Sequence, residues 1–139
     1  MTYENILVVI VLAAAAITDV KKREIPNWLL MAGIIASLII SAFRGWNVLA
    51  IRIIVAAILF LIMYFLLFRT GLLPGGDIKA LTFTVLALGP LMFVDWIGYL
   101  AVCSIPCIIY YGIIRTGKTI PYALPMFLAS VILVWRGVF

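Results

Sequence analysis

Long apolar runs make up most of the chain, and short clusters of charged residues separate them. Each run approaches the roughly 20 residues that a helix needs to cross the hydrocarbon core of a bilayer. The pattern therefore predicts six membrane-spanning helices joined by short connections. We place them at Asn5 to Thr18, Pro26 to Phe43, Val48 to Phe68, Ile78 to Val94, Trp96 to Ile114 and Ile120 to Trp135.

Short connections favour antiparallel neighbours, so the predicted fold class is an all-α membrane protein whose six helices form one transmembrane domain over residues 1–139. The composition agrees with this fold class. With 68% hydrophobic residues, 11% charged residues and a mean hydropathy of +1.34, the chain is too apolar for an ordinary soluble domain. The first run is interpreted as a retained helix. A cleavable signal carries its basic residues before the apolar core, whereas here Lys21, Lys22 and Arg23 follow it.

The Lys and Arg residues predict the orientation of the helices. Seven of the ten lie in or beside the connections after the first, third and fifth helices, and three lie on the other side. Because cytoplasmic loops carry the excess of Lys and Arg, we expect both termini to be extracytoplasmic. Arg52, near the outer end of the third helix, is expected to snorkel to the interface. The net charge of +5 does not indicate nucleic-acid binding, since the basic residues follow no single face.

This predicted topology divides the five acidic residues between the two sides of the membrane. Glu4 and Asp95 fall on the extracytoplasmic side, and Asp19, Glu24 and Asp77 fall on the cytoplasmic side. Asp19 ends the first helix and Asp77 opens the fourth, where a carboxylate beside lipid is costly and tends to be kept for function or pairing. Glu24 has basic neighbours and is interpreted as a solvated loop charge.

Asp19 and Asp77 are therefore the candidate catalytic pair. Two carboxylates that meet in a poorly solvated site tend to share one proton near neutral pH. An aspartic protease works in this way, because its ionised member takes a proton from water while the protonated member polarises the peptide carbonyl. The chain has no histidine, which excludes Ser-His and Cys-His hydrolases and the commonest zinc sites. We expect neither a metal nor a cofactor.

Each aspartate alone also fits a structural role. Asp19 could simply end a helix in the interface, and Asp77 could be a helix N-cap. Gly75 and Gly76 before Asp77 would allow a tight bend and leave room for an extended substrate strand. A Gly-Gly-Asp sequence fits a turn followed by a helix cap equally well.

Two segments together resemble the type IV prepilin peptidase family of intramembrane aspartyl proteases. The first is Asp-Val-Lys-Lys-Arg-Glu-Ile-Pro-Asn from Asp19 to Asn27, and the second is Gly-Gly-Asp-Ile-Lys from Gly75 to Lys79. That family has six helices, an aspartate at the cytoplasmic end of helix one followed by a basic stretch and Ile-Pro-Asn, and a Gly-x-Gly-Asp-x-Lys motif opening helix four. The resemblance implies that Asp19 and Asp77 are the catalytic dyad.

The resemblance also implies a set of residues that support the motifs or bind substrate: Gly75, Gly76, Lys79, Pro26 and Asn27. Lys79 either tunes a carboxylate or anchors helix four at the interface. Pro26 suits the first turn of helix two, where a missing N–H costs little.

The chain departs from the family in two ways. Pro74 replaces the first glycine of the second motif and restricts the backbone there. Larger members carry a cytoplasmic domain with paired cysteines that is associated with N-methylation of the trimmed pilin. The two cysteines here, Cys103 and Cys107, lie one helical turn apart in an apolar run and are interpreted as packing residues. The resemblance thus implies a peptidase without methyltransferase activity.

The implied function is an intramembrane aspartic endopeptidase that removes the leader of a prepilin or pilin-like precursor at the cytoplasmic face of a prokaryotic plasma membrane. Expected partners are that precursor and membrane lipid, and the sequence leaves the oligomeric state open. Two alternatives use the same aspartates. One is a small proton-coupled carrier, and the other is an inactive relative that binds leader peptides.

Overall fold

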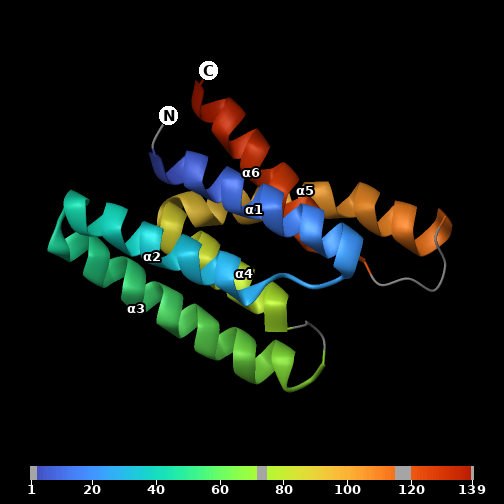
Figure 1. Cartoon of the computed structure of the whole chain (residues 1–139), viewed down its shortest axis with the longest axis horizontal. Coiled ribbons are helices and arrows are strands. Elements are labelled where there is room, and N and C mark those ends of the chain that lie inside the picture. The colour runs from blue at the N-terminus through green and yellow to red at the C-terminus, as the bar shows by residue number, and fades with distance from the viewer. Residues whose placement is uncertain (1–2, 72–74, 115–119, 139) are drawn as a thin grey trace.

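The computed structural model describes residues 3–71, 75–114 and 120–138, and all the regular secondary structure within them is helical. Six α-helices follow one another, and short π-helical segments (η1 and η2) continue the third and fifth. The bounds are α1 Tyr3–Lys22, α2 Asn27–Arg44, α3 Trp46–Met63, η1 Tyr64–Phe68, α4 Gly75–Leu88, α5 Pro90–Ile109, η2 Tyr110–Ile114 and α6 Ala123–Val138. The predicted all-α class is confirmed (Figure 1).

Four of these helices are long and apolar enough to cross a membrane. They are α1 with 20 residues, α2 with 18, α3 and η1 together with 23, and α5 and η2 together with 25. The remaining two are shorter, with 14 residues in α4 and 16 in α6. The chain is therefore a multi-pass membrane protein by helix length and composition. That all six helices cross, and that both termini lie outside, stay predictions.

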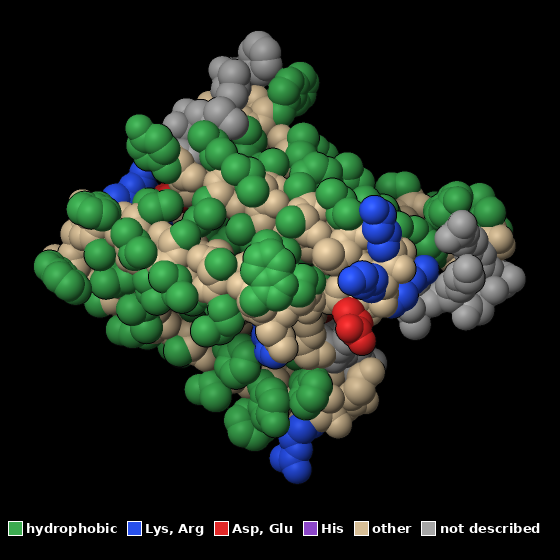
Figure 2. All heavy atoms as spheres, in the orientation of Figure 1, with side chains coloured by type: hydrophobic (Ala, Val, Ile, Leu, Met, Phe, Trp, Pro, Cys, Tyr) green, Lys and Arg blue, Asp and Glu red, His purple; other side chains and the backbone are tan. Residues whose placement is uncertain are grey.

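The α4 helix lies at the centre of the bundle and packs against α1, α2, α3 and α5. Phe83 and Thr84 on this helix are fully buried, and nearly every other side chain along it is buried as well. A helix that is buried all round is typical of a core element. By contrast, α2 and α3 expose long rows of apolar side chains such as Ile35, Ile39 and Ile58, as expected for lipid contact. Figure 2 shows hydrophobic side chains over most of one face of the molecule.

The last turn of α1, the start of α2 and the start of α4 meet at one end of the bundle, away from the two chain termini (Figure 1). The α1–α2 connection is short and turns at Arg23, which has a φ of 59°. This arrangement brings the two sequence motifs to the same end. The opposite end holds the turns between α2 and α3 and between α4 and α5.

The predicted boundary between the fourth and fifth helices is wrong. The prediction ended the fourth at Val94 because Asp95 interrupts the apolar run, but α4 ends at Leu88 and Asp95 lies inside α5 with an exposed side chain. Gly89, with a φ of 80°, forms the turn, and Pro90 begins the next helix. Glycine adopts this conformation readily, and proline suits a first helical position, so Gly-Pro ends a helix more effectively than one charge does.

The expectation for Arg52 is also wrong. Arg52 does not snorkel to the interface, because only 5% of it is exposed and its guanidinium bonds to Glu4 inside the bundle. Glu4 belongs to α1 and is itself 2% exposed. Sequence patterns did not reveal this pair because the residues are 48 positions apart. A charged side chain can stay ionised inside a bundle when a side chain of opposite charge contacts it.

Candidate active site

Asp19 lies in the last turn of α1, which extends beyond the predicted end at Thr18 as far as Lys22. Asp19 is 8% exposed, and its Oδ2 accepts a hydrogen bond of 3.2 Å from the backbone N–H of Ala123. That N–H belongs to the first residue of α6, so it is one of the donors that a helix start leaves without an intrahelical partner. A buried carboxylate is thus matched to a buried, otherwise unpaired donor.

Small side chains permit this contact. Ala15 and Ala16 on α1 form a buried cluster with Ala123, and none of the three is more than 4% exposed. Methyl groups keep the two backbones close, so the start of α6 reaches the last turn of α1. This contact was not predicted from the sequence. Backbone donors leave no residue-type signal, and α6 begins later than the predicted Ile120.

Asp77 is the third residue of α4 and is 4% exposed. It lies inside the first turn rather than before it, so the N-cap interpretation is wrong. Gly75 opens the helix, where an added Cβ would lie 3.3 Å from Cε2 of Phe68, tighter than most real contacts. At Gly76 an added Cβ would meet Ile25 at an ordinary 3.7 Å.

The two carboxylates lie close enough to interact electrostatically. Asp77 precedes the apolar segment that starts at Ile78 and lies outside the four helices long enough to span a membrane. Burial raises the pKa of Asp77 to about 7, and the nearby charge of Asp19 adds to the rise. The chain therefore places these two aspartates near one another. Their catalytic role is a separate question.

Lys79 and Asn27 join the two motifs directly. Lys79 Nζ donates a hydrogen bond of 2.9 Å to Oδ1 of Asn27, and both side chains are exposed. Asn27 is the first residue of α2. Pro26 precedes it with φ −67° and ψ 128°, so it occupies the N-cap position rather than the predicted first turn. The hydrogen bond of Lys79 to α2 is neither of the two roles expected from the sequence, and both of those roles stay predictions.

Three of the other residues considered in the sequence lie within the described part of the chain. Glu24 is exposed in the α1–α2 connection, as expected for a solvated charge. Cys103 and Cys107 are free and buried on α5, as expected for packing residues. Pro74 lies outside the described residues, so its effect on the loop stays a prediction. Within residues 3–71, 75–114 and 120–138, no group of three or more His, Cys, Asp or Glu side chains could hold a metal ion.

One contact near Asp19 was not expected from the sequence. The guanidinium of Arg23 lies over the ring of Tyr111, 5.5 Å from its centroid, which connects the α1–α2 turn to η2. A cation over an aromatic face is attracted by the ring quadrupole. The contact ties the turn next to Asp19 to the far end of the α5 segment.

Comparison with known proteins gives one match. A model of the type IV leader peptidase family matches residues 6–135, which is nearly the whole chain and includes both aspartates. No curated protein and no solved structure matches the chain.

Proposed function

The chain belongs to the type IV leader peptidase family, and we propose that it is an aspartic endopeptidase that removes the leader of a prepilin or pilin-like precursor. The observation that carries this proposal is the meeting of two buried aspartates, Asp19 and Asp77, at one end of a membrane helix bundle. Such a pair can share a proton, as peptide hydrolysis by carboxylates requires.

The surroundings of the two aspartates support different roles for them. The Ala123 N–H donates a hydrogen bond to Asp19 and offsets part of the cost of burying its charge, whereas burial raises the pKa of Asp77 to about 7, so Asp77 holds a proton below that pH. Asp19 takes a proton from a water molecule as the water oxygen attacks the peptide carbonyl carbon. Asp77 donates its proton to the carbonyl oxygen. When the C–N bond breaks, the proton held by Asp19 passes to the leaving nitrogen, and a hydroxyl proton of the tetrahedral intermediate returns to Asp77 as the carboxylic acid product forms.

The precursor would bring an apolar helix and a basic leader. The apolar helix can pack between enzyme helices in lipid while the scissile bond lies near the membrane boundary. A helical peptide bond is shielded by its own backbone, so the substrate must unwind at the cut. Beside Asp77, an added Cβ at Gly75 would meet Phe68 and one at Gly76 would meet Ile25, so the chain's own side chains bound the space at these two glycines.

We place the aspartates at the cytoplasmic face of a prokaryotic plasma membrane. The exposed Lys21, Lys22 and Lys79 lie at the same end of the bundle as the dyad. A concentration of Lys and Arg on one side is the usual signature of the cytoplasmic side.

The test is to express a pilin-like precursor with the wild-type chain or with a variant, and to follow the precursor mass. Asp19→Asn and Asp77→Asn should each lower the rate of cleavage by at least about 100-fold, because each removes one proton-transfer partner. Glu24→Gln is the matched control, since it neutralises an exposed carboxylate at the same end of the bundle. It should cleave at the wild-type rate.

Membrane insertion of every variant is measured by alkaline extraction of membranes. Cleavage by either inserted Asn variant at the wild-type rate would overturn the dyad assignment. A proton-coupled carrier would instead show pH-dependent flux in proteoliposomes that depends on the same two aspartates. An inactive leader-binding relative would leave the precursor uncut by the wild-type chain.

A further inference from the structure

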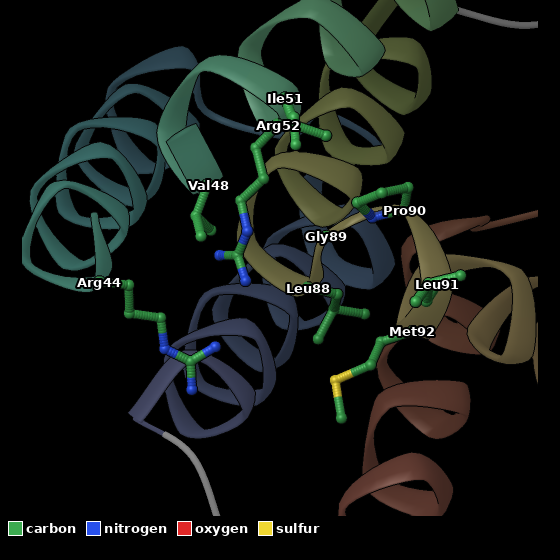
Figure 3. Close-up of a pocket in the computed structure, with 9 residues that line it drawn as sticks. All are labelled: Arg44, Val48, Ile51, Arg52, Leu88, Gly89, Pro90, Leu91 and Met92. Carbon is green, nitrogen blue, oxygen red and sulfur yellow. The ribbon is translucent and has the colours of Figure 1, made fainter. Parts of the chain in front are cut away.

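A hollow of about 300 Å³ lies at the end of the bundle opposite the aspartates. Its walls come from the end of α2, the first turns of α3, and the turn between α4 and α5. The guanidinium groups of Arg44 and Arg52 point into the same space between these elements (Figure 3). Much of the remaining wall is apolar, including Val48, Leu88, Pro90 and Met92.

The hollow carries an excess of positive charge. Glu4 is the carboxylate that meets both arginines, with Oε1 at 2.6 Å from Arg52 Nη1 and Oε2 at 3.1 Å from Arg44 Nη1. One carboxylate and two guanidinium groups leave a net charge of +1 in this cluster. Excess charge beside apolar walls is costly unless a counter-charge meets it. The cluster is therefore complementary to one further negative group.

The two arginines have different tasks. Arg52 is buried. Its Nη1 donates hydrogen bonds to Glu4, to Oγ of Ser41 at 3.0 Å and to the carbonyl oxygen of Ala87 at 2.9 Å. These bonds hold α1, α2, α3 and the end of α4 together. Arg44 has a side chain that is 47% exposed, and among the described residues its polar contact is the single ion pair with Glu4. A guanidinium has five N–H donors, so Arg44 keeps donors for a ligand.

The surroundings of the hollow indicate a lipid as the source of the negative group. Ile51 lines the hollow and is 55% exposed, and Ile54 and Ile58 continue the same exposed apolar face along α3. A soluble anion would gain nothing from this face. A phospholipid can place its phosphate at Arg44 while its acyl chains cover the isoleucines.

We propose that this hollow binds the headgroup of an anionic phospholipid, with Arg44 contacting the phosphate and the apolar face of α3 contacting the acyl chains. The lipid completes the charge balance of the Glu4, Arg44 and Arg52 cluster. It thereby stabilises the end of the bundle where α2, α3 and the α4–α5 turn converge. The proposal does not depend on the peptidase activity.

Thermal unfolding of the purified full chain in a neutral detergent tests the proposal, with tryptophan fluorescence as the readout. Phosphatidylglycerol should raise the Tm of the wild-type chain more than phosphatidylcholine with the same acyl chains. Inorganic phosphate at the same concentration should leave the Tm unchanged. Arg44→Gln should remove the difference between the two lipids, because it removes the exposed guanidinium and leaves the Glu4–Arg52 pair in place.

Arg136→Gln is the matched control. Arg136 is an exposed arginine near the C-terminus, at the same end of the bundle, and it donates a hydrogen bond to Tyr99 away from the hollow. This variant loses the same charge and should keep the preference for phosphatidylglycerol. Native mass spectrometry of the wild-type chain gives a second measurement that needs no variant, and it should show retained phosphatidylglycerol in excess over phosphatidylcholine.

Four results would overturn the proposal. The first is equal stabilisation of the wild-type chain by both lipids, and the second is an intact preference in Arg44→Gln. The third is loss of the preference in Arg136→Gln, which would indicate a general charge effect. The fourth is stabilisation by inorganic phosphate alone, which would make the hollow a site for free anions.

Discussion

Lys79 Nζ donates a hydrogen bond of 2.9 Å to Oδ1 of Asn27, although the two residues are 52 positions apart. Asn27 begins α2, and Lys79 lies two residues beyond Asp77 in the first turns of α4. The bond therefore fixes the start of α4 relative to the connection that follows Asp19. It connects the Ile-Pro-Asn segment directly with the Gly-Gly-Asp-Ile-Lys segment.

Lys79→Ala and Asn27→Ala should lower precursor cleavage by similar factors of about fivefold each, because each removes one side of the same exposed hydrogen bond. The double variant should be no worse than either single variant, since the bond can be lost only once. Cleavage rates of the three variants measure this. If Lys79→Ala abolished cleavage while Asn27→Ala had no effect, Lys79 would act on a carboxylate instead.

The fold was predictable from the sequence to the extent that apolar runs report helices. Six runs correctly predict six helices, but run length cannot locate a break such as Gly89-Pro90, which contains no charge. Motif positions placed Asp19 and Asp77 at the same end of the bundle. The Ala123 donor and the burial of Glu4 with Arg52 were not predictable, since both are contacts between residues distant in sequence.

Stability of the wild-type chain should fall as pH rises toward 7, and Asp77 is the expected cause. Its pKa rises from an ordinary 3.8 to about 7 in the folded chain, so between these values the folded state holds a proton that the unfolded state has lost. The stabilising contribution is complete below pH 3.8 and is lost as pH rises through 7. Asp77→Asn should remove this part of the pH dependence in thermal unfolding measured between pH 4 and pH 8. If the thermal stability of the wild-type chain and that of Asp77→Asn changed with pH in the same way, Asp77 would not be the cause.

Cleavage activity should also fall as pH rises through about 7, because Asp77 must hold a proton to act as the acid. The rate for a single precursor, measured in proteoliposomes of constant composition, gives the profile. Activity that rises steadily from pH 6 to pH 9 would reverse the proposed roles of the two aspartates. Glu24→Gln should show the wild-type profile, since Glu24 is exposed and takes no part in the proposed chemistry.

Packing between α2 and α4 depends on the absence of a side chain at Gly33. A Cβ there would lie 2.8 Å from Cε2 of Phe83, which is fully buried. Gly33→Ala should therefore lower the free energy of unfolding by about 1–3 kcal/mol. The control is Gly98→Ala on α5, where no atom lies within 4 Å of the added Cβ. It should be neutral or stabilising by up to about 1 kcal/mol, because alanine favours helix more than glycine does.

Glu4 holds the opposite end of the bundle together by its bonds to Arg52 and Arg44. Glu4→Ala leaves a buried guanidinium without its counter-charge, so it should lower the free energy of unfolding by about 3–5 kcal/mol. The measurement is SDS titration of the purified chain in mixed micelles. Asp95→Ala removes an exposed carboxylate from α5 near the same end and should change stability by no more than about 0.5 kcal/mol.

The double variant Glu4→Ala with Arg52→Met separates loss of the ion pair from burial of an unpaired charge. Methionine fills much of the volume of the arginine stem and needs no counter-charge, so replacing both partners should restore a large part of the stability lost in Glu4→Ala. The remaining loss in the free energy of unfolding then measures the contribution of the bonds from Arg52 to Ser41 and to the Ala87 carbonyl. A double variant less stable than Glu4→Ala would show that these two bonds, rather than the ion pair, dominate at this end of the bundle.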